Sequence, residues 1–153
     1  MRVIEPWVAA PLQGFLDESG ARLTLLMTAA GQVIAQDGFT RSVDVMAASA
    51  LGAGIIASLD ALAEVMGSGR FTAVLHQGSK QSLYLRAFDT PRGRWIGLVV
   101  FGPETSVGIV QLFFDRMVTE LEAGAPREAA AMPKLAENFE HELDASLKAL
   151  FGR

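Results

Sequence analysis

The longest apolar stretch of the sequence, from Ser42 to Met66, predicts a long helix. Ser42 or Asp44 can accept the free amide hydrogens of a first helical turn, and Gly67-Ser68-Gly69 provides a stop. Fifteen uncharged residues lie between Asp44 and Asp60, fewer than the roughly twenty that a membrane-spanning helix needs. We therefore expect a buried helix of a soluble protein, with no membrane span.

One flank of this helix has almost no side-chain bulk. Small residues follow one another at intervals of four, with further small residues beside them: Ser49, Ala53, Ala57 and Ala61, with Ala50, Gly54 and Ser58. The other flank is bulky: Leu51, Ile55, Leu59, Leu62, Val65 and Met66. Glycine inside a helix costs roughly 1 kcal/mol relative to alanine, so the smooth flank indicates close approach of another backbone. Tight packing on the chain's own sheet and an interface with a partner both fit.

The remaining pattern predicts an α+β domain. Short turns separate the expected strands, so the sheet is antiparallel and helices pack on its faces. Ile96 to Phe101 is apolar on both faces, which predicts a central strand. The expected elements are a helix at 9–18, strands at 22–28 and 32–36, the long helix, strands at 71–76, 81–88 and 95–101, and a helix from Thr105-Ser106 to about Glu122.

Composition changes after residue 123. Residues 1–123 form the expected domain, and residues 124–133 are small, bracketed by prolines and without a periodic apolar face, as in a linker. Residues 134–153 predict an amphipathic helix, because apolar residues recur every three or four positions: Leu135, Phe139, Leu143, Leu147, Leu150 and Phe151.

Composition argues against most site chemistry. The 13 Lys and Arg are scattered and the formal charge is −4, which disfavours nucleic-acid binding. Cysteine is absent and there are two histidines; His76 has no catalytic constellation around it, and Glu137-x-x-Glu140-His141 is best interpreted as a solvated helix face. No glycine-rich phosphate loop follows a strand. We expect no metal, no cofactor and no catalytic residue.

Two further expectations concern location and a possible arginine finger. The N-terminal residues lack the apolar core of a signal peptide, because Glu5 and Pro6 interrupt it, so we expect a cytoplasmic protein. An arginine could act on another protein's nucleotide in trans. Nothing in the spacing selects one of the candidates, which are Arg70, Arg86, Arg92 and Arg94.

Several motifs, taken in order, resemble the Roadblock (dynein light chain type) domain family. They are Gly20-Ala21-Arg22 leading into 23–27, Ala30-Gly31 leading into 32–35, the helix end at 62–67, and the segments 76–85 and 106–112. The last two are similar to bacterial members that pair with a Ras-like GTPase. The resemblance implies five antiparallel strands, the long helix on one face and the first and third helices on the other.

The resemblance also implies a homodimer that binds a small Ras-like GTPase. Long helices and edge strands would meet at the dimer interface, which falls on Leu51, Ile55, Arg70, Phe71 and Ala73. The GTPase would dock over the paired long helices, at positions that fall on Ala53, Gly54, Ala57, Ser58 and Ala61. Ile55 stands where these relatives carry asparagine, which puts the choice of GTPase in question.

The function implied is that of a GTPase-activating regulator in bacterial polarity or motility, not of an enzyme in itself. Such proteins remodel the switch segments of the GTPase and supply no arginine finger. The alternative is a Roadblock scaffold that binds a GTPase, or another Roadblock chain, without accelerating hydrolysis. Measured GTP turnover separates the two.

Overall fold

A computed structural model describes residues 1–126 and 145–150 of the chain. In the first of these ranges six strands form one antiparallel sheet in the order β1-β3-β2-β6-β5-β4. The elements are β1 (Arg2–Val3), the 3-10 helix η1 (Pro6–Val8), α1 (Ala9–Ser19), β2 (Leu23–Thr28), β3 (Val33–Gly38), α2 (Val45–Val65), β4 (Ala73–Gln77), β5 (Ser82–Thr90), β6 (Gly93–Phe101) and α3 (Val107–Gly124). The α+β class is confirmed.

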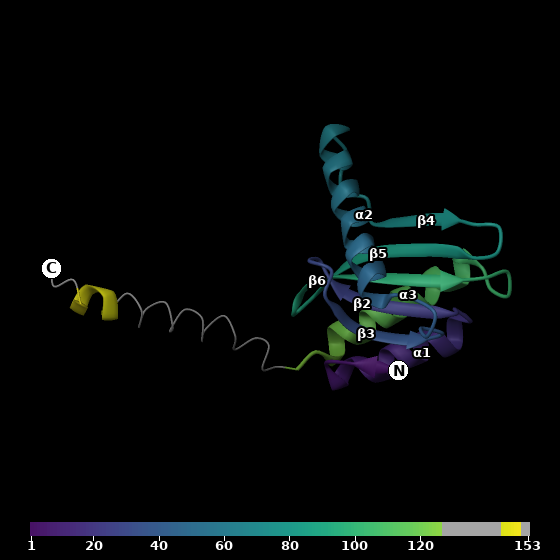
Figure 1. The fold of residues 1–153 in the computed structure, drawn as a ribbon, viewed down its shortest axis with the longest axis horizontal. Coiled ribbons are helices and arrows are strands. Elements are labelled where there is room, and N and C mark those ends of the chain that lie inside the picture. The colour runs from purple at the N-terminus through teal and green to yellow at the C-terminus, as the bar shows by residue number, and fades with distance from the viewer. Residues whose placement is uncertain (127–144, 151–153) are drawn as a thin grey trace.

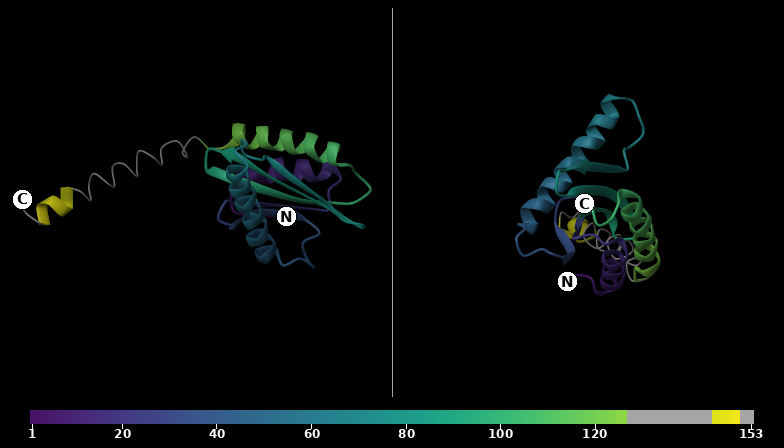
Figure 2. Two further views of the ribbon diagram at one scale, coloured as in Figure 1. Left: turned by 90° about the horizontal axis from the view of Figure 1, so that it is seen from above. Right: turned by 90° about the vertical axis from the view of Figure 1, so that its right-hand side faces the viewer.

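The helices cover the sheet in two layers. Helices α1 and α3 lie side by side on one face, and α2 lies on the other (Figure 2). Strand β6 lies between β2 and β5 in the middle of the sheet, and β4 lies at one edge. The predicted positions of the helices, the central strand and the edge strand are therefore confirmed.

The expectation of five strands was wrong by one. Arg2 and Val3 pair with Gln36 and Ala35, which adds β1 outside β3, and the Ile4 N–H donates to the Ile34 carbonyl at 2.9 Å. Two residues are too few to show an alternating pattern. Their strand conformation depends on the free edge of β3, which is a tertiary feature.

The core beneath α1 and α3 is built around the ring of Phe114. This ring meets those of Phe15, Tyr84 and Phe88 edge to face, with centroids 5.8, 5.5 and 5.6 Å apart. A Cβ atom on Gly97 would lie 2.4 Å from Phe114 Cζ. Glycine at position 97 is therefore what lets α3 approach the middle of β6.

Helix α2 begins as predicted but is less buried than predicted. The Ala47 N–H donates to Asp44 Oδ1 at 3.1 Å and so caps the first turn. Beyond the middle of the helix the axis passes β4 and leaves the sheet (Figure 1). The expectation of a buried helix was therefore wrong, because only five of its residues are buried: Ser49, Gly52, Ala53, Ile56 and Ala63.

By length and composition alone, α2 could cross a membrane. The uncharged window at 45–59 is too short for a span, but the whole helix has 21 residues, because it continues through Asp60 and Glu64. The core helices of soluble proteins meet the same criterion, so this is weak support for a membrane location.

The linker predicted at 124–133 and the amphipathic helix predicted at 134–153 lie mostly outside the described residues. Helix α3 ends at Gly124, and residues 145–150 are helical. The domain division stays a prediction.

Candidate partner-binding surface on helix α2

The first half of the small-residue flank serves the chain's own packing. The Ser49 hydroxyl is buried and donates to the Gly31 carbonyl at 2.7 Å, and a Cβ atom on Gly31 would lie 3.2 Å from Ala50 Cα. Small side chains here let the turn between β2 and β3 rest against α2. Ala53 is only 7% exposed, so it offers a GTPase little surface in the single chain, and its expected place in a GTPase site stays a prediction.

The second half of the flank faces solvent. Ala57, Ala61, Gly54 and Ser58 are exposed, and nothing lies within 4 Å of a Cβ atom placed on Gly54. The Ser58 hydroxyl donates to the Gly54 carbonyl at 2.9 Å, so it is satisfied within the helix. We call these four residues the smooth strip. Such a surface offers no chemistry of its own and admits the close approach of another backbone.

The bulky flank of α2 borders an open apolar groove of about 890 Å³ on the sheet. Leu51 and Ile55 lie on its helix side, 70% and 40% exposed. We call it the sheet-face groove; strands β5 and β6 form its floor through Leu83, Leu85, Leu98 and Val100. Monomeric proteins rarely leave an apolar face of this kind uncovered.

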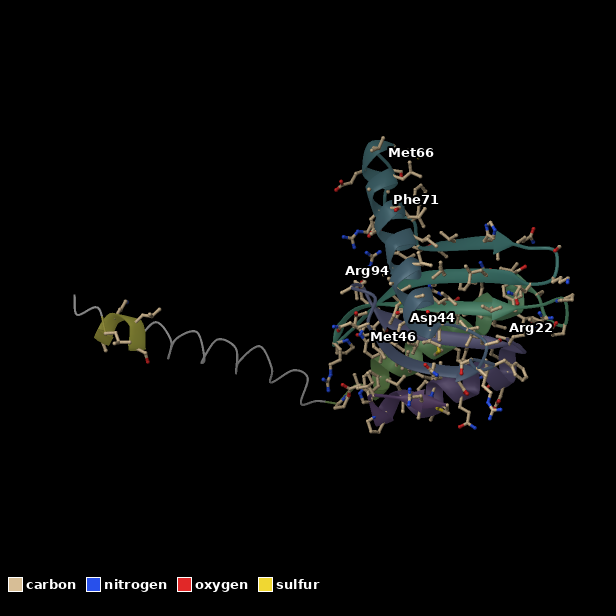
Figure 3. The ribbon with its side chains drawn as sticks, viewed as in Figure 1. Arg22, Asp44, Met46, Met66, Phe71 and Arg94 are labelled. Carbon is tan, nitrogen blue, oxygen red and sulfur yellow. The ribbon has the colours of Figure 1, made fainter. Side chains whose placement is uncertain are left out.

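The edge of the sheet next to this groove is also open. Strand β4 has β5 on one side and no strand on the other within the described residues. Phe71 lies on the segment that leads from α2 to β4, and Met66 marks the end of α2 (Figure 3). Of the expected interface residues here, Arg70 and Phe71 are exposed and Ala73 is half-buried.

An ion pair links α2 to the sheet. The Arg94 guanidinium, from β6, donates to both carboxylate oxygens of Asp60 at 2.6 and 3.2 Å. This bond lowers the pKa of the Asp60 carboxyl below its usual range and raises that of Arg94. It joins α2 to β6 one position past Leu59, the last α2 residue packed on the core of this face.

The arginine-finger candidates differ in their bonding. Arg86 pairs with Asp115, Arg92 with Glu5 and Arg94 with Asp60. Each of these three is engaged in the folded chain, which makes it a poor donor to another protein's phosphate.

Arg70 forms no ion pair within the described residues, and His76 is exposed on β4. No group of three metal-ligating side chains occurs in the part of the chain that the structure describes. Glu137, Glu140 and His141 lie outside it.

The spacing of small residues in the sequence indicates the smooth strip, but it does not indicate the neighbouring groove or the ion pair between Asp60 and Arg94. The sheet-face groove joins residues from three strands and a helix that are distant in sequence. The Asp60 and Arg94 partners are 34 positions apart. Neither arrangement leaves a signal in local spacing.

The sheet order, the two helix layers and the exposed face of α2 define a Roadblock-type protein. The family model of the Roadblock/LC7 domain matches residues 10–90. The chain belongs to the Roadblock/LC7 domain family. No curated protein matches the sequence significantly.

Among solved structures the chain is similar to MglB. MglB of Myxococcus xanthus is 28% identical, with a TM-score of 0.72, and the match covers 78% of this chain and 95% of that one. The gliding protein MglB of Thermus thermophilus is 27% identical, with a TM-score of 0.68 and coverage of 80% and 94%. An MglB with a tetrameric arrangement is 28% identical, with a TM-score of 0.68 and coverage of 80% and 89%.

Proposed function

We propose that this chain is a homodimeric, cytoplasmic regulator that binds a small Ras-like GTPase of the MglA type and stimulates its GTP hydrolysis, in bacterial polarity or motility. The observation that carries the proposal is the smooth strip. It is exposed on a domain similar to MglB, on the long helix over which the family resemblance leads us to expect a GTPase to dock. Ala57 and Ala61 are the central contacts, with Gly54 and Ser58 beside them.

Three features support the dimer. The outer side of β4 is free to pair with a second β4, α2 extends past this edge (Figure 1), and the sheet-face groove is uncovered. Paired β4 strands would carry the free half of each α2 toward the partner's sheet, where its bulky flank meets the groove. The interface then includes Leu51, Ile55, Arg70, Phe71 and Ala73. The tetrameric arrangement of one MglB is a further indication that such chains self-associate.

The proposed mechanism is positional. Phosphoryl transfer proceeds through a loose transition state that depends on the placement of charge and water. Arg86, Arg92 and Arg94 are held in ion pairs of their own chain, which supports a mechanism in which these three supply no arginine finger. A surface without bulk lets the switch segments of the GTPase lie against α2, and ordering them brings the GTPase's own arginine and glutamine to the phosphates.

Single-turnover GTP hydrolysis by an MglA-like GTPase, with and without this protein, tests the proposal. Ala57→Arg and Ala61→Arg each place a long charged side chain on the smooth strip. We expect GTPase affinity to fall more than tenfold, which corresponds to about 1.4 kcal/mol, while the dimer persists. Ala10→Arg, on the exposed side of α1, is the matched control and leaves affinity unchanged.

The outcomes separate the possible functions. Faster hydrolysis that both strip variants abolish supports the activating role. Binding without acceleration supports the scaffold instead. Unchanged affinity in both strip variants contradicts docking on α2.

A further inference from the structure

A second groove, of about 600 Å³, lies between β1, β3 and the start of α2. We call it the β1 groove. Ile4 and Met46 stand on its two sides, 72% and 79% exposed, and Val33 and Val45 lie between them half-buried. Large apolar side chains with this exposure face solvent at a considerable cost. Ile4, just after β1, and Met46, on α2, therefore frame an apolar site that a partner can fill.

The charge around the β1 groove is positive. Eight arginines fall within the described residues, and five of them form ion pairs. Of the three that form none there, Arg2 and Arg41 line this groove. The single carboxylate among the lining residues is Asp44, and it is engaged in capping α2. An apolar floor flanked by two free guanidinium groups suits an apolar side chain flanked by carboxylates.

The β1 groove continues the smooth strip along α2. Met46 and Ala50 precede Ala57 and Ala61 at spacings of four, seven and four, which places all four on one side of a helix with 3.6 residues per turn. Met46 lies at the start of α2, well away from Met66 at its far end (Figure 3). A protein docked on the smooth strip therefore reaches the groove without leaving this side of the helix.

The groove stays open in the proposed dimer. It lies at the β1 and β3 end of the sheet, whereas β4 is the strand at the opposite end. A dimer formed through β4 leaves the groove free for another protein.

We propose that the β1 groove is a second contact site for the GTPase and takes an exposed apolar side chain that has acidic neighbours. This inference rests on the proposed function and adds a determinant of partner choice. The family model begins at residue 10, so β1, with Arg2, and the residue after it, Ile4, lie outside the matched region. Residues before position 10 can therefore differ between proteins that share the Roadblock domain, and contacts made by these residues can select one GTPase over another.

The test measures the dissociation constant for an MglA-like GTPase loaded with a non-hydrolysable GTP analogue, at low and at high salt. The variants are Arg41→Glu and Met46→Asp. Their matched controls are Lys80→Glu and Leu112→Asp, at exposed positions that do not line the β1 groove. We expect each groove variant to weaken binding about tenfold, the range for reversing a charge or removing an apolar side chain at an interface. Binding by Arg41→Glu should also depend less on salt than wild-type binding does.

If the groove variants bind the GTPase within twofold of wild type, the inference is overturned. The proposed function is still upheld in that case when Ala57→Arg abolishes binding. A wild-type protein that binds no GTPase overturns both. Vesicles of anionic lipid provide the remaining comparison. If wild type binds them, Arg41→Glu does not, and GTPase affinity is the same for both, the groove faces a membrane surface and the inference is wrong.

Discussion

Replacing Leu51 with alanine tests the proposed dimer at a residue that contributes little to the isolated chain. The side chain is 70% exposed and lies beside the sheet-face groove. In a two-fold dimer it would be covered in both copies. The substitution therefore acts on association much more than on folding.

The size of the effect follows from the exposed fraction. Leucine to alanine removes three carbons, which contribute about 2.4 kcal/mol when fully buried, at about 0.8 kcal/mol each. Since Leu51 is 70% exposed in the single chain, burial in a dimer would recover up to about 1.7 kcal/mol per copy. Two copies give at most about 3.4 kcal/mol, or an increase of about 300-fold in the dimer dissociation constant.

Sedimentation equilibrium over a range of concentrations measures this constant for Leu51→Ala and for wild type. We expect an increase between tenfold and about 300-fold. Leu112→Ala is the matched control, because Leu112 is 62% exposed on α3, on the opposite face of the sheet. A dissociation constant equal to that of wild type, or a monomeric wild-type protein, refutes the reasoning.

The remaining predictions concern the core, acid stability and the tail. Gly97→Ala forces a Cβ atom into the Phe114 ring, and thermal unfolding should show a loss of about 1–3 kcal/mol; an unchanged melting temperature would contradict this account of the packing. Because Arg94 lowers the pKa of Asp60, the ion pair stabilises the fold fully above the usual Asp pKa and is lost as the pH falls through the lower folded-state value. Melting curves of Asp60→Asn should therefore depend less on pH below about pH 4, and identical pH profiles would count against the pair. A chain that ends at Gly124 should fold, dimerise and melt within a few degrees of the full chain but alter GTPase stimulation; insolubility would place the tail in the core.

Local sequence determined most of the secondary structure. Asp44 and Ser106 accept amide hydrogens at the starts of α2 and α3, as their positions before apolar helical runs predicted. Alternation along β5 separates the core under α3 from the core under α2, and the continuous apolar run of β6 correctly predicts the middle of the sheet. Caps, turns and side-chain periods act between residues a few positions apart, so one sequence suffices to find them.

The tertiary structure alone decided which part of α2 is available to a partner. Ala53 and Ala57 are the same residue type on the same flank, four positions apart, yet Ala53 is buried and Ala57 is exposed. Spacing specifies the direction in which a side chain points around the helix axis. Burial depends in addition on where that axis leaves the sheet, and this depends on contacts distant in sequence, such as Arg94 with Asp60 and Ser49 with Gly31.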